Sequence, residues 1–285
     1  MSRIFLFFLG VFLALPASAL TLIDDSGQPV TLARPASRIV SLAPTATELI
    51  YAAGAGDQLV GVVSFSDWPE QAAKLPVIGR FDRLDLEAIL ALKPDLAIAW
   101  ADGNRPAELR RLEKLGVPVF VLHTRQIPDV ARHLRLIGQL ANTKATAGQA
   151  ADTFLRRIAA LPAPAADMPR QRVFIELWDR PLTTLAGGGI VDQAITRCGG
   201  KNVFAALPGQ APAVSTEAVL AADPQILIAT GMTGARADWL IAWQRWPTLS
   251  AVREQRLHTL DPDLLFRAGP RLAEGLEALC RIIQP

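Results

Sequence analysis

The sequence predicts an α/β protein made of two similar lobes with mostly parallel sheets, joined by one long backbone helix, with a ligand cleft between the lobes. Strand-like segments alternate with helix-like segments on both sides of residues 143–161. One stretch of the first half reappears in the second half with the same spacing. Residues 143–161 themselves form one amphipathic helix, which is typical of a rigid connector. A single large domain containing an ordinary helix is the alternative.

The internal repeat is clearest when residues 85–99 are laid over residues 215–229. The two segments share Glu, Ala, Leu and Pro at the same offsets, and each predicts a short helix, a proline stop and a buried strand. A strand near Arg38 with a helix ending at Gly54 likewise matches a strand near Arg172 with a helix ending at Gly199. Two matches in the same order indicate two lobes of one architecture.

In the first half, the order of elements follows from periodicity and from turn residues. We expect a hairpin at 21–32, strands at 38–42, 59–64, 96–100 and 117–122, and helices at 44–54, 85–92, 105–115 and 130–140. The connector has apolar residues at steps of three and four, and either Asn142 or Thr143 can cap its start. The expected parts are an N-terminal lobe at 20–125, a connecting helical segment at 126–165 and a C-terminal lobe at 166–285.

Residues 1–19 have the pattern of a cleaved secretory signal peptide. Arg3 supplies the positive charge, residues 4–15 form a short apolar run, and Ala17–Ala19 is a small-residue cleavage site. The run is too short for a membrane span, and no Cys follows the cleavage site to carry a lipid anchor. The net charge of only +2 and the absence of a Lys/Arg run do not favour nucleic-acid binding. A soluble periplasmic protein is expected.

Cys198 and Cys280 are the only cysteines of the chain. In an oxidising compartment such a pair favours a disulfide, which would lie within the second lobe. Two buried thiols are the alternative. No C-x-x-C spacing is present, so neither redox catalysis nor a zinc knuckle is expected.

Sequence motifs give little support to an enzyme. Neither G-x-S-x-G nor a Walker sequence is present, and Ser66-Asp67 has no placed histidine beside it. The three histidines are too scattered for a catalytic or metal site, and we expect His133 on a solvated helix surface. The glycines at 187–189 precede a helix and could meet a polar ligand, but a plain turn is preferred. An exported α/β enzyme is therefore the less favoured class.

Aromatic and charged residues gather where the predicted strands end. Ligands of parallel α/β sheets bind beyond the carboxyl ends of the strands. Aromatic rings there offer flat apolar contact, whereas Asp and Arg offer polar anchoring. Each aromatic could equally belong to the core. The candidates are Phe65, Trp68, Phe81, Trp100, Trp178 and the segment Asp263–Arg267.

Glu87 and Glu217 occupy the same position of the repeat, in the first turn of a predicted helix. An acidic residue there is favourable with the helix dipole, and this needs no partner. Matched acids on matched lobes also predict two docking points for a basic partner surface.

Three segments, 38–49, 61–69 and 86–96, carry a resemblance to the helical-backbone substrate-binding proteins of ABC importers. The resemblance extends over essentially the whole mature chain. It implies two lobes with a cleft between them and a bridging helix that permits little closure. The cobalamin-binding members of the family are the most similar.

The resemblance also implies roles for particular residues. Phe65, Phe81 and Trp100 stand at aromatic ligand positions. The matching ligand-contacting loop comprises Asp263, Leu264, Leu265, Phe266 and Arg267. Thr183 and Ala211 stand where the cobalamin-binding members have a phenylalanine and a tryptophan, so Thr183 is a further candidate position and Trp178 could compensate. Trp68 is a further candidate from its place after a predicted strand. Glu87 and Glu217 match acids that dock on arginines of the membrane permease, and Cys198 and Cys280 match a disulfide pair.

The expected function is capture of cobalamin, or a related corrinoid, for delivery to an ABC importer by a monomeric binding protein. Cobalamin would be a transported ligand; no cofactor, metal or catalysis is expected. The alternative is a haem or iron-siderophore receptor of the same class. A siderophore site would want several basic residues, and only Arg180 and Arg267 are obvious. A haem site would want a Tyr or His ligand at a strand end, and a zinc or manganese site would want several cleft-facing histidines, which are not found.

Overall fold

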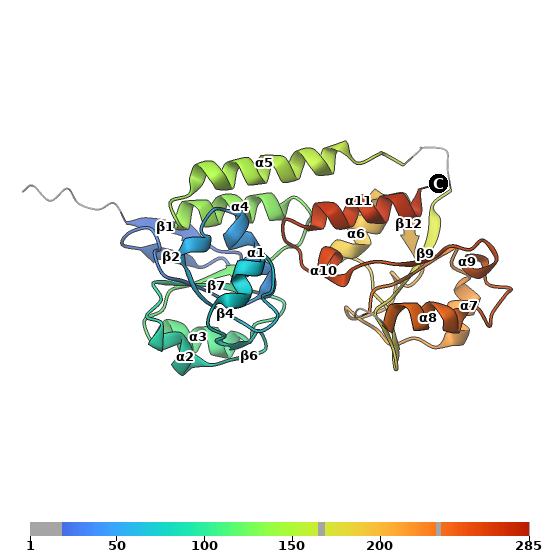
Figure 1. Cartoon of the computed structure of the whole chain (residues 1–285), viewed down its shortest axis with the longest axis horizontal. Coiled ribbons are helices and arrows are strands. Elements are labelled where there is room, and N and C mark those ends of the chain that lie inside the picture. The colour runs from blue at the N-terminus through green and yellow to red at the C-terminus, as the bar shows by residue number, and fades with distance from the viewer. Residues whose placement is uncertain (1–18, 165–168, 232–234, 285) are drawn as a thin grey trace, which may run out of the picture.

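The computed structural model describes residues 19–164, 169–231 and 235–284, and it consists of two lobes connected along one side by helices (Figure 1). This arrangement confirms the predicted fold class. The predicted signal peptide lies outside the described residues except for Ala19. In the part of the chain that the structure describes, no helix is both long enough and apolar enough to cross a membrane.

The N-terminal lobe is built on a four-stranded parallel sheet of order β4-β3-β7-β8. Its strands are short and apolar, and most of their residues are buried, as expected for a parallel sheet covered on both faces. They are β3 (Ile39–Ser41), β4 (Leu59–Val62), β7 (Leu96–Trp100) and β8 (Val119–Leu122). The helices are α1 (Pro44–Ala52), α2 (Leu86–Ala91) and α3 (Pro106–Lys114), with the 3₁₀ turns η1 (Gly56–Gln58) and η2 (Glu70–Lys74). Two antiparallel pairs complete the lobe: β1 (Leu20–Ile23) with β2 (Pro29–Leu32), and β5 (Gly79–Arg80) with β6 (Arg83–Leu84).

The C-terminal lobe repeats the plan with a second four-stranded parallel sheet, of order β12-β9-β13-β14. Its strands are β9 (Gln171–Glu176), β12 (Gly200–Asn202), β13 (Ile226–Ala229) and β14 (Leu257–Thr259). A small hairpin of β10 (Trp178–Asp179) and β11 (Leu182–Thr183) follows β9. The helices are α6 (Ile190–Arg197), α7 (Thr216–Ala222), α8 (Ala235–Trp243), α9 (Ser250–Arg253), α10 (Pro262–Leu265) and α11 (Leu272–Ile283).

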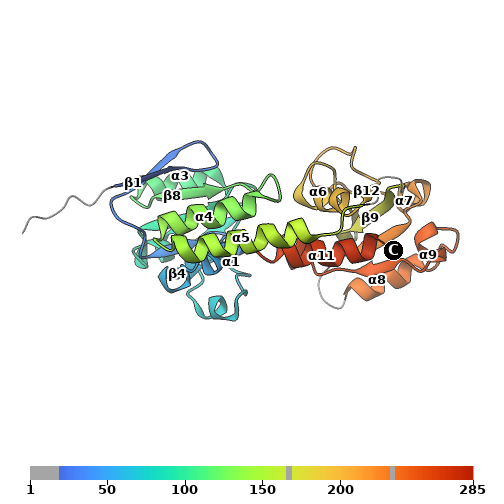
Figure 2. The same cartoon turned by 90° about the horizontal axis from the view of Figure 1, so that it is seen from above.

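The connector is α5 (Lys144–Ala160), within one residue of the predicted span at each end. It lies beside α4 (Asp129–Leu140) over the N-terminal lobe and reaches α11 of the other lobe (Figure 2). Arg157 of α5 donates two hydrogen bonds of 2.9 Å to Glu277 of α11. The expected side-chain cap is wrong, because neither Asn142 nor Thr143 caps the helix and the Thr143 hydroxyl is buried without a partner.

One apolar core runs through both lobes by way of the connecting helices. The structure joins Cys198 at the end of α6 to Cys280 of α11, which confirms the predicted disulfide. The expectation for His133 is wrong: this side chain is fully buried, and its Nε2 lies 2.6 Å from Oδ2 of Asp25. The apolar face of α4 includes the histidine because the turn of the β1–β2 hairpin supplies a carboxylate partner there.

Candidate functional site

A cavity of about 640 Å³ lies between the two lobes. The N-terminal lobe contributes Trp100 at the carboxyl end of β7, whereas the C-terminal lobe contributes Leu265 and Phe266 at the end of α10. Three of the predicted ligand residues therefore come together from opposite lobes. Parallel sheets place such sites beyond the ends of their strands, and the cavity follows this rule.

Phe81 and Trp100 form an aromatic pair, with ring centroids 6.0 Å apart and planes tilted by 60°. Asn104, which is buried, holds both residues in place. Its Oδ1 accepts a 2.7 Å bond from the backbone N–H of Trp100, and its Nδ2 donates a 2.7 Å bond to the carbonyl of Phe81. Asn104 was not predicted as a site residue, because its only signal in the sequence is a polar residue shortly after a predicted strand.

Phe65 follows β4 and points a largely free ring outward, with 65% of the residue exposed. Its φ is +66°, in the left-handed region that bulky residues avoid. Strained backbone of this kind is concentrated at binding sites. Phe65 does not itself line the inter-lobe cavity.

Arg267 lies at the junction of the lobes, with its side chain only 13% exposed. Its Nη1 donates a 2.6 Å bond to Asp67 of the N-terminal lobe, and its Nη2 lies 3.0 Å from Asp263. Burial alone would lower the pKa of Arg267, but the hydrogen bond to Asp67 and the charge of Asp263 hold it above its ordinary value. Burial raises the pKa of Asp263 in spite of the nearby arginine. The guanidinium therefore stays charged, and its Nη1 and Nη2 are engaged by carboxylates of both lobes.

Other predicted residues lie elsewhere. Trp178 makes an edge-to-face contact with Trp239, at 5.8 Å between centroids, and lines a separate cavity of about 710 Å³ within the C-terminal lobe. Trp68 covers the guanidinium of Arg271 at 4.8 Å. Leu264 packs its backbone against α11 at Gly275, where an added Cβ would collide with the Leu264 carbonyl.

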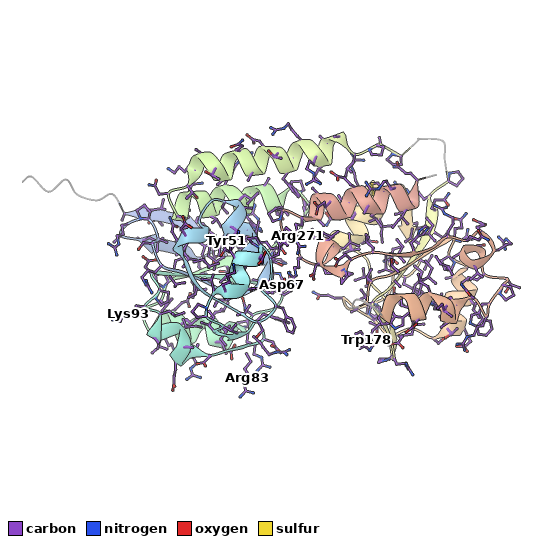
Figure 3. The ribbon with its side chains drawn as sticks, in the orientation of Figure 1. Tyr51, Asp67, Arg83, Lys93, Trp178 and Arg271 are labelled. Carbon is purple, nitrogen blue, oxygen red and sulfur yellow. A yellow bond between two sulfur atoms is a disulfide. The ribbon has the colours of Figure 1, made fainter. Side chains whose placement is uncertain are left out.

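Thr183 and Trp178 are direct cross-strand partners in the β10–β11 hairpin, so their side chains share one face. The Trp178 ring therefore stands beside the position where the family pattern places an aromatic residue. Figure 3 shows Trp178 on the C-terminal lobe, well separated from Asp67 and Arg271 at the junction. Ala211 is exposed and two residues from Ala213, which bridges to Thr183.

His123 follows β8 and lines the inter-lobe cavity. This placement was not predicted, although the predicted strand 117–122 ends beside His123. Its Nε2 lies 3.2 Å from Oδ1 of Asp102, and its Nδ1 accepts a 3.1 Å bond from Arg125. The glycines at 187–189 line the opposite wall of the cavity, just before α6. This is the position that contact between their backbone amides and a polar ligand would require. Among the described residues, no group of three or more His, Cys, Asp or Glu could hold a metal ion.

Glu87 and Glu217 lie in the first turns of α2 and α7, and both are exposed. Asp85 and Ser215 cap these helices in the same way, accepting bonds from the backbone N–H three residues later. Hydrogen bonds from its own backbone N–H and from Ser215 lower the pKa of Glu217. The two acids are thus equivalent and accessible surface charges.

Comparison with known proteins places these features in a family. The Periplasmic binding protein family model matches residues 39–264, and the chain belongs to this family. The vitamin B12-binding protein of Vibrio cholerae is 36% identical over 258 residues, which cover 90% of this chain and 93% of the relative. The vitamin B12-binding protein of Yersinia pestis is 35% identical, with coverage of 96% and 94%.

Two solved structures extend the comparison. The periplasmic vitamin B12 binding protein BtuF of Vibrio cholerae superposes with a TM-score of 0.80 at 36% identity, covering 88% of this chain and 97% of that chain. The periplasmic heme-binding protein RhuT of Roseiflexus has a TM-score of 0.75 at 27% identity, covering 87% and 97%. The fold is thus shared by proteins that carry two different tetrapyrrole-type ligands.

Proposed function

We propose that this chain is a periplasmic substrate-binding protein that captures cobalamin, or a related corrinoid, and delivers it to an ABC importer. The observation that carries the proposal is the cavity between the lobes, where Trp100 faces Leu265 and Phe266. Aromatic and apolar walls suit a large flat ring system, and Asp263 and Arg267 at the edge suit its peripheral amides. Identity of 36% with a vitamin B12-binding protein over 90% of the chain supports this choice of ligand.

The remaining ligand contacts are proposed by position. Phe65 and Phe81 extend the aromatic wall of the N-terminal lobe, while Leu264 supports the loop that presents Arg267. Thr183 and Trp178 are proposed as peripheral contacts from the β10–β11 hairpin, outside the inter-lobe cavity, and their shared face supports compensation by Trp178. Trp68 acts indirectly, through its contact with Arg271.

The wider setting completes the proposal. The chain acts as a soluble monomer, exported by a signal peptide cleaved after Ala19, and it binds its ligand without transforming it. Glu87 and Glu217 dock on basic residues of the membrane permease, and their matching caps and exposure support this role.

Haem is the second candidate ligand, and His123 is the observation that favours it. Its imidazole follows a strand and lines the inter-lobe cavity, which is where an axial haem ligand would be needed. In the structure this ring already pairs with Asp102 and Arg125. If the ligand is haem, His123→Ala would abolish haemin binding; if it is a corrinoid, the same change would leave cyanocobalamin binding nearly intact.

Equilibrium dialysis against cyanocobalamin tests the placement of the site. Trp100→Ala and Arg267→Ala should each weaken binding by about tenfold or more, because Trp100 lines the cavity and Arg267 adjoins it next to Phe266. Arg110→Ala is the control, since Arg110 is exposed on α3 and does not line the inter-lobe cavity. Equal losses in all three variants would contradict an inter-lobe site.

A further inference from the structure

A cluster of charged residues joins the lobes beside the ligand-lining segment. Glu48 of α1 accepts hydrogen bonds of 2.6 and 3.0 Å from Arg271, which precedes α11 in the other lobe. Arg267 approaches the same carboxylate at 3.4 Å and also donates to Asp67 at 2.6 Å. Figure 3 shows Asp67 and Arg271 near the region where the two lobes adjoin. Two carboxylates of one lobe thus face two guanidinium groups of the other.

Burial makes the cluster sensitive to the loss of any member. The Glu48 side chain is 1% exposed, and that of Arg271 is 17% exposed under the ring of Trp68. Gly269 has no side chain, and this lets the C-terminal lobe approach the Glu48 carboxylate closely. An added Cβ at Gly269 would lie 3.4 Å from Oε2 of Glu48. Removing one partner of such a pair leaves an uncompensated buried charge, which is far more costly than losing an exposed pair.

The cluster is continuous with the proposed site. Asp67 is two residues from Phe65, and Arg267 directly follows Phe266, which lines the inter-lobe cavity. An ion pair between Asp67 and Arg267 therefore links a ligand segment of one lobe to a ligand segment of the other. Any displacement of the lobes would move the guanidinium relative to the aromatic wall at Trp100.

We propose that Glu48 is a positioning residue for ligand binding, which fixes Arg271 and Arg267 from the opposite lobe and so sets both the lobe spacing and the direction of the Arg267 guanidinium. The proposal rests on the function proposed above. Arg267 then meets carbonyl oxygens of corrinoid amide groups without the entropy cost of ordering a long side chain at the moment of binding. Affinity therefore depends on a carboxylate that does not itself contact the ligand.

A double-mutant cycle tests this role in the full chain. Glu48→Gln, which keeps the shape of the side chain and removes its charge, should weaken cyanocobalamin binding about tenfold, mainly through faster dissociation. In an Arg267→Ala background the same change should have an effect of less than about twofold, because the group it positions is gone. A purely structural role would give equal losses in both backgrounds and would overturn the proposal, as would undiminished binding by Glu48→Gln.

Two further variants keep the experiment decisive. Glu277→Gln removes another doubly hydrogen-bonded Arg–Glu pair, between α5 and α11, and should leave affinity unchanged. Should Glu48→Gln fail to fold, Arg271→Lys replaces it in the cycle, since an ammonium cannot supply two parallel hydrogen bonds to the carboxylate.

A distance measurement separates this inference from the proposed function. Spin labels at positions 110 and 244, which are exposed on different lobes, report the lobe spacing without any ligand. We expect a narrow distance distribution that broadens in Glu48→Gln; an unchanged distribution would overturn the positioning role. If the wild-type chain binds no corrinoid, the proposed function fails, while the distance distribution still decides whether Glu48 fixes the lobes.

Discussion

At the scale of single residues, Phe65 shows how stability can be exchanged for binding. A bulky residue in the left-handed region costs on the order of 1–2 kcal/mol, and the exposed ring regains little of this by packing. Phe65→Asn should raise the free energy of unfolding by up to about 1 kcal/mol, because Asn tolerates this conformation. It should also weaken cyanocobalamin binding about tenfold through the lost apolar contact.

Chemical denaturation and ligand titration of the same samples check both halves of this prediction. Phe65→Tyr is the control and should preserve both stability and affinity. A variant Phe65→Asn that binds as tightly as wild type would remove Phe65 from the site.

Glu176 gives a prediction about pH. Burial raises its pKa to about 7, in spite of a 2.9 Å hydrogen bond from Trp243. The folded state therefore favours the protonated acid, so the contribution of Glu176 to stability is fully present below pH 4.5, its ordinary value, and is lost as the pH rises to about 7. At roughly 1.4 kcal/mol per pKa unit, the loss amounts to about 3 kcal/mol.

Glu176→Gln should accordingly be more stable than wild type at pH 8 and lose that advantage below pH 5, as urea midpoints across a pH series would show. Glu254→Gln, at an exposed position, should show no such pH-dependent difference in stability from wild type. A difference between Glu176→Gln and wild type that does not vary with pH would contradict the raised pKa.

Single residues also show where prediction from sequence works. The Cys198–Cys280 pair was predictable because only two cysteines are present and the first residues have the sequence pattern of an export signal. The burial of His133 was not predictable, because its partner Asp25 belongs to a hairpin and lies 108 residues away in the sequence. Trp178 and Trp68 come after strands, and Trp100 is the last residue of one. Trp178 nevertheless contacts Trp239, and Trp68 contacts Arg271, so neither lines the inter-lobe cavity as Trp100 does. Periodicity gives the position of a residue along its element but not the neighbours that other elements supply.

At the scale of elements, the contact between α4 and α5 depends on one missing side chain. Gly138 is buried in α4, and a Cβ there would collide with the Cβ of Ala147 on α5. Gly138→Ala should destabilise the chain by about 1–3 kcal/mol, although Ala is the better helix former, because the helices must separate.

Gly148→Ala provides the matched control within the connector. A Cβ at Gly148 meets nothing within 4 Å, so this change should stabilise the chain by about 0.5–1 kcal/mol. Thermal unfolding of both variants tests the pair, and an increase in melting temperature for Gly138→Ala would contradict the close packing of α4 on α5.

The elements themselves were largely predictable. The sheets and connector follow from apolar runs, proline stops and the repeat, whose two copies became α2 with β7 and α7 with β13. The β10–β11 hairpin and short α10 were not foreseen, because segments of two to four residues carry no periodicity. These short elements position Thr183, Leu265 and Arg267, so the C-terminal side of the site was less predictable than its N-terminal side.

At the scale of the whole molecule, the two lobes offer a matched pair of acids to a partner. Glu87→Arg combined with Glu217→Arg should leave cyanocobalamin binding unchanged, because neither residue lines the inter-lobe cavity. Vitamin uptake by cells that depend on this protein should fall to background, since both docking charges would be reversed and like charges repel across an interface.

Uptake of labelled cyanocobalamin, with binding measured on the purified double variant, checks this outcome. Reversal of one exposed acid on each lobe, Glu113→Arg with Glu254→Arg, serves as a control of equal charge change. Wild-type uptake by the Glu87→Arg, Glu217→Arg chain would eliminate the docking role.

The central claim is that a corrinoid binds between the lobes, and quenching of intrinsic tryptophan fluorescence tests it most directly. Trp100 lies in the inter-lobe cavity, so cyanocobalamin should quench emission saturably and with one-to-one stoichiometry after correction for its own absorbance. Haemin, titrated in parallel, should quench only weakly. Saturable quenching by haemin alone, or by neither compound, would contradict the account.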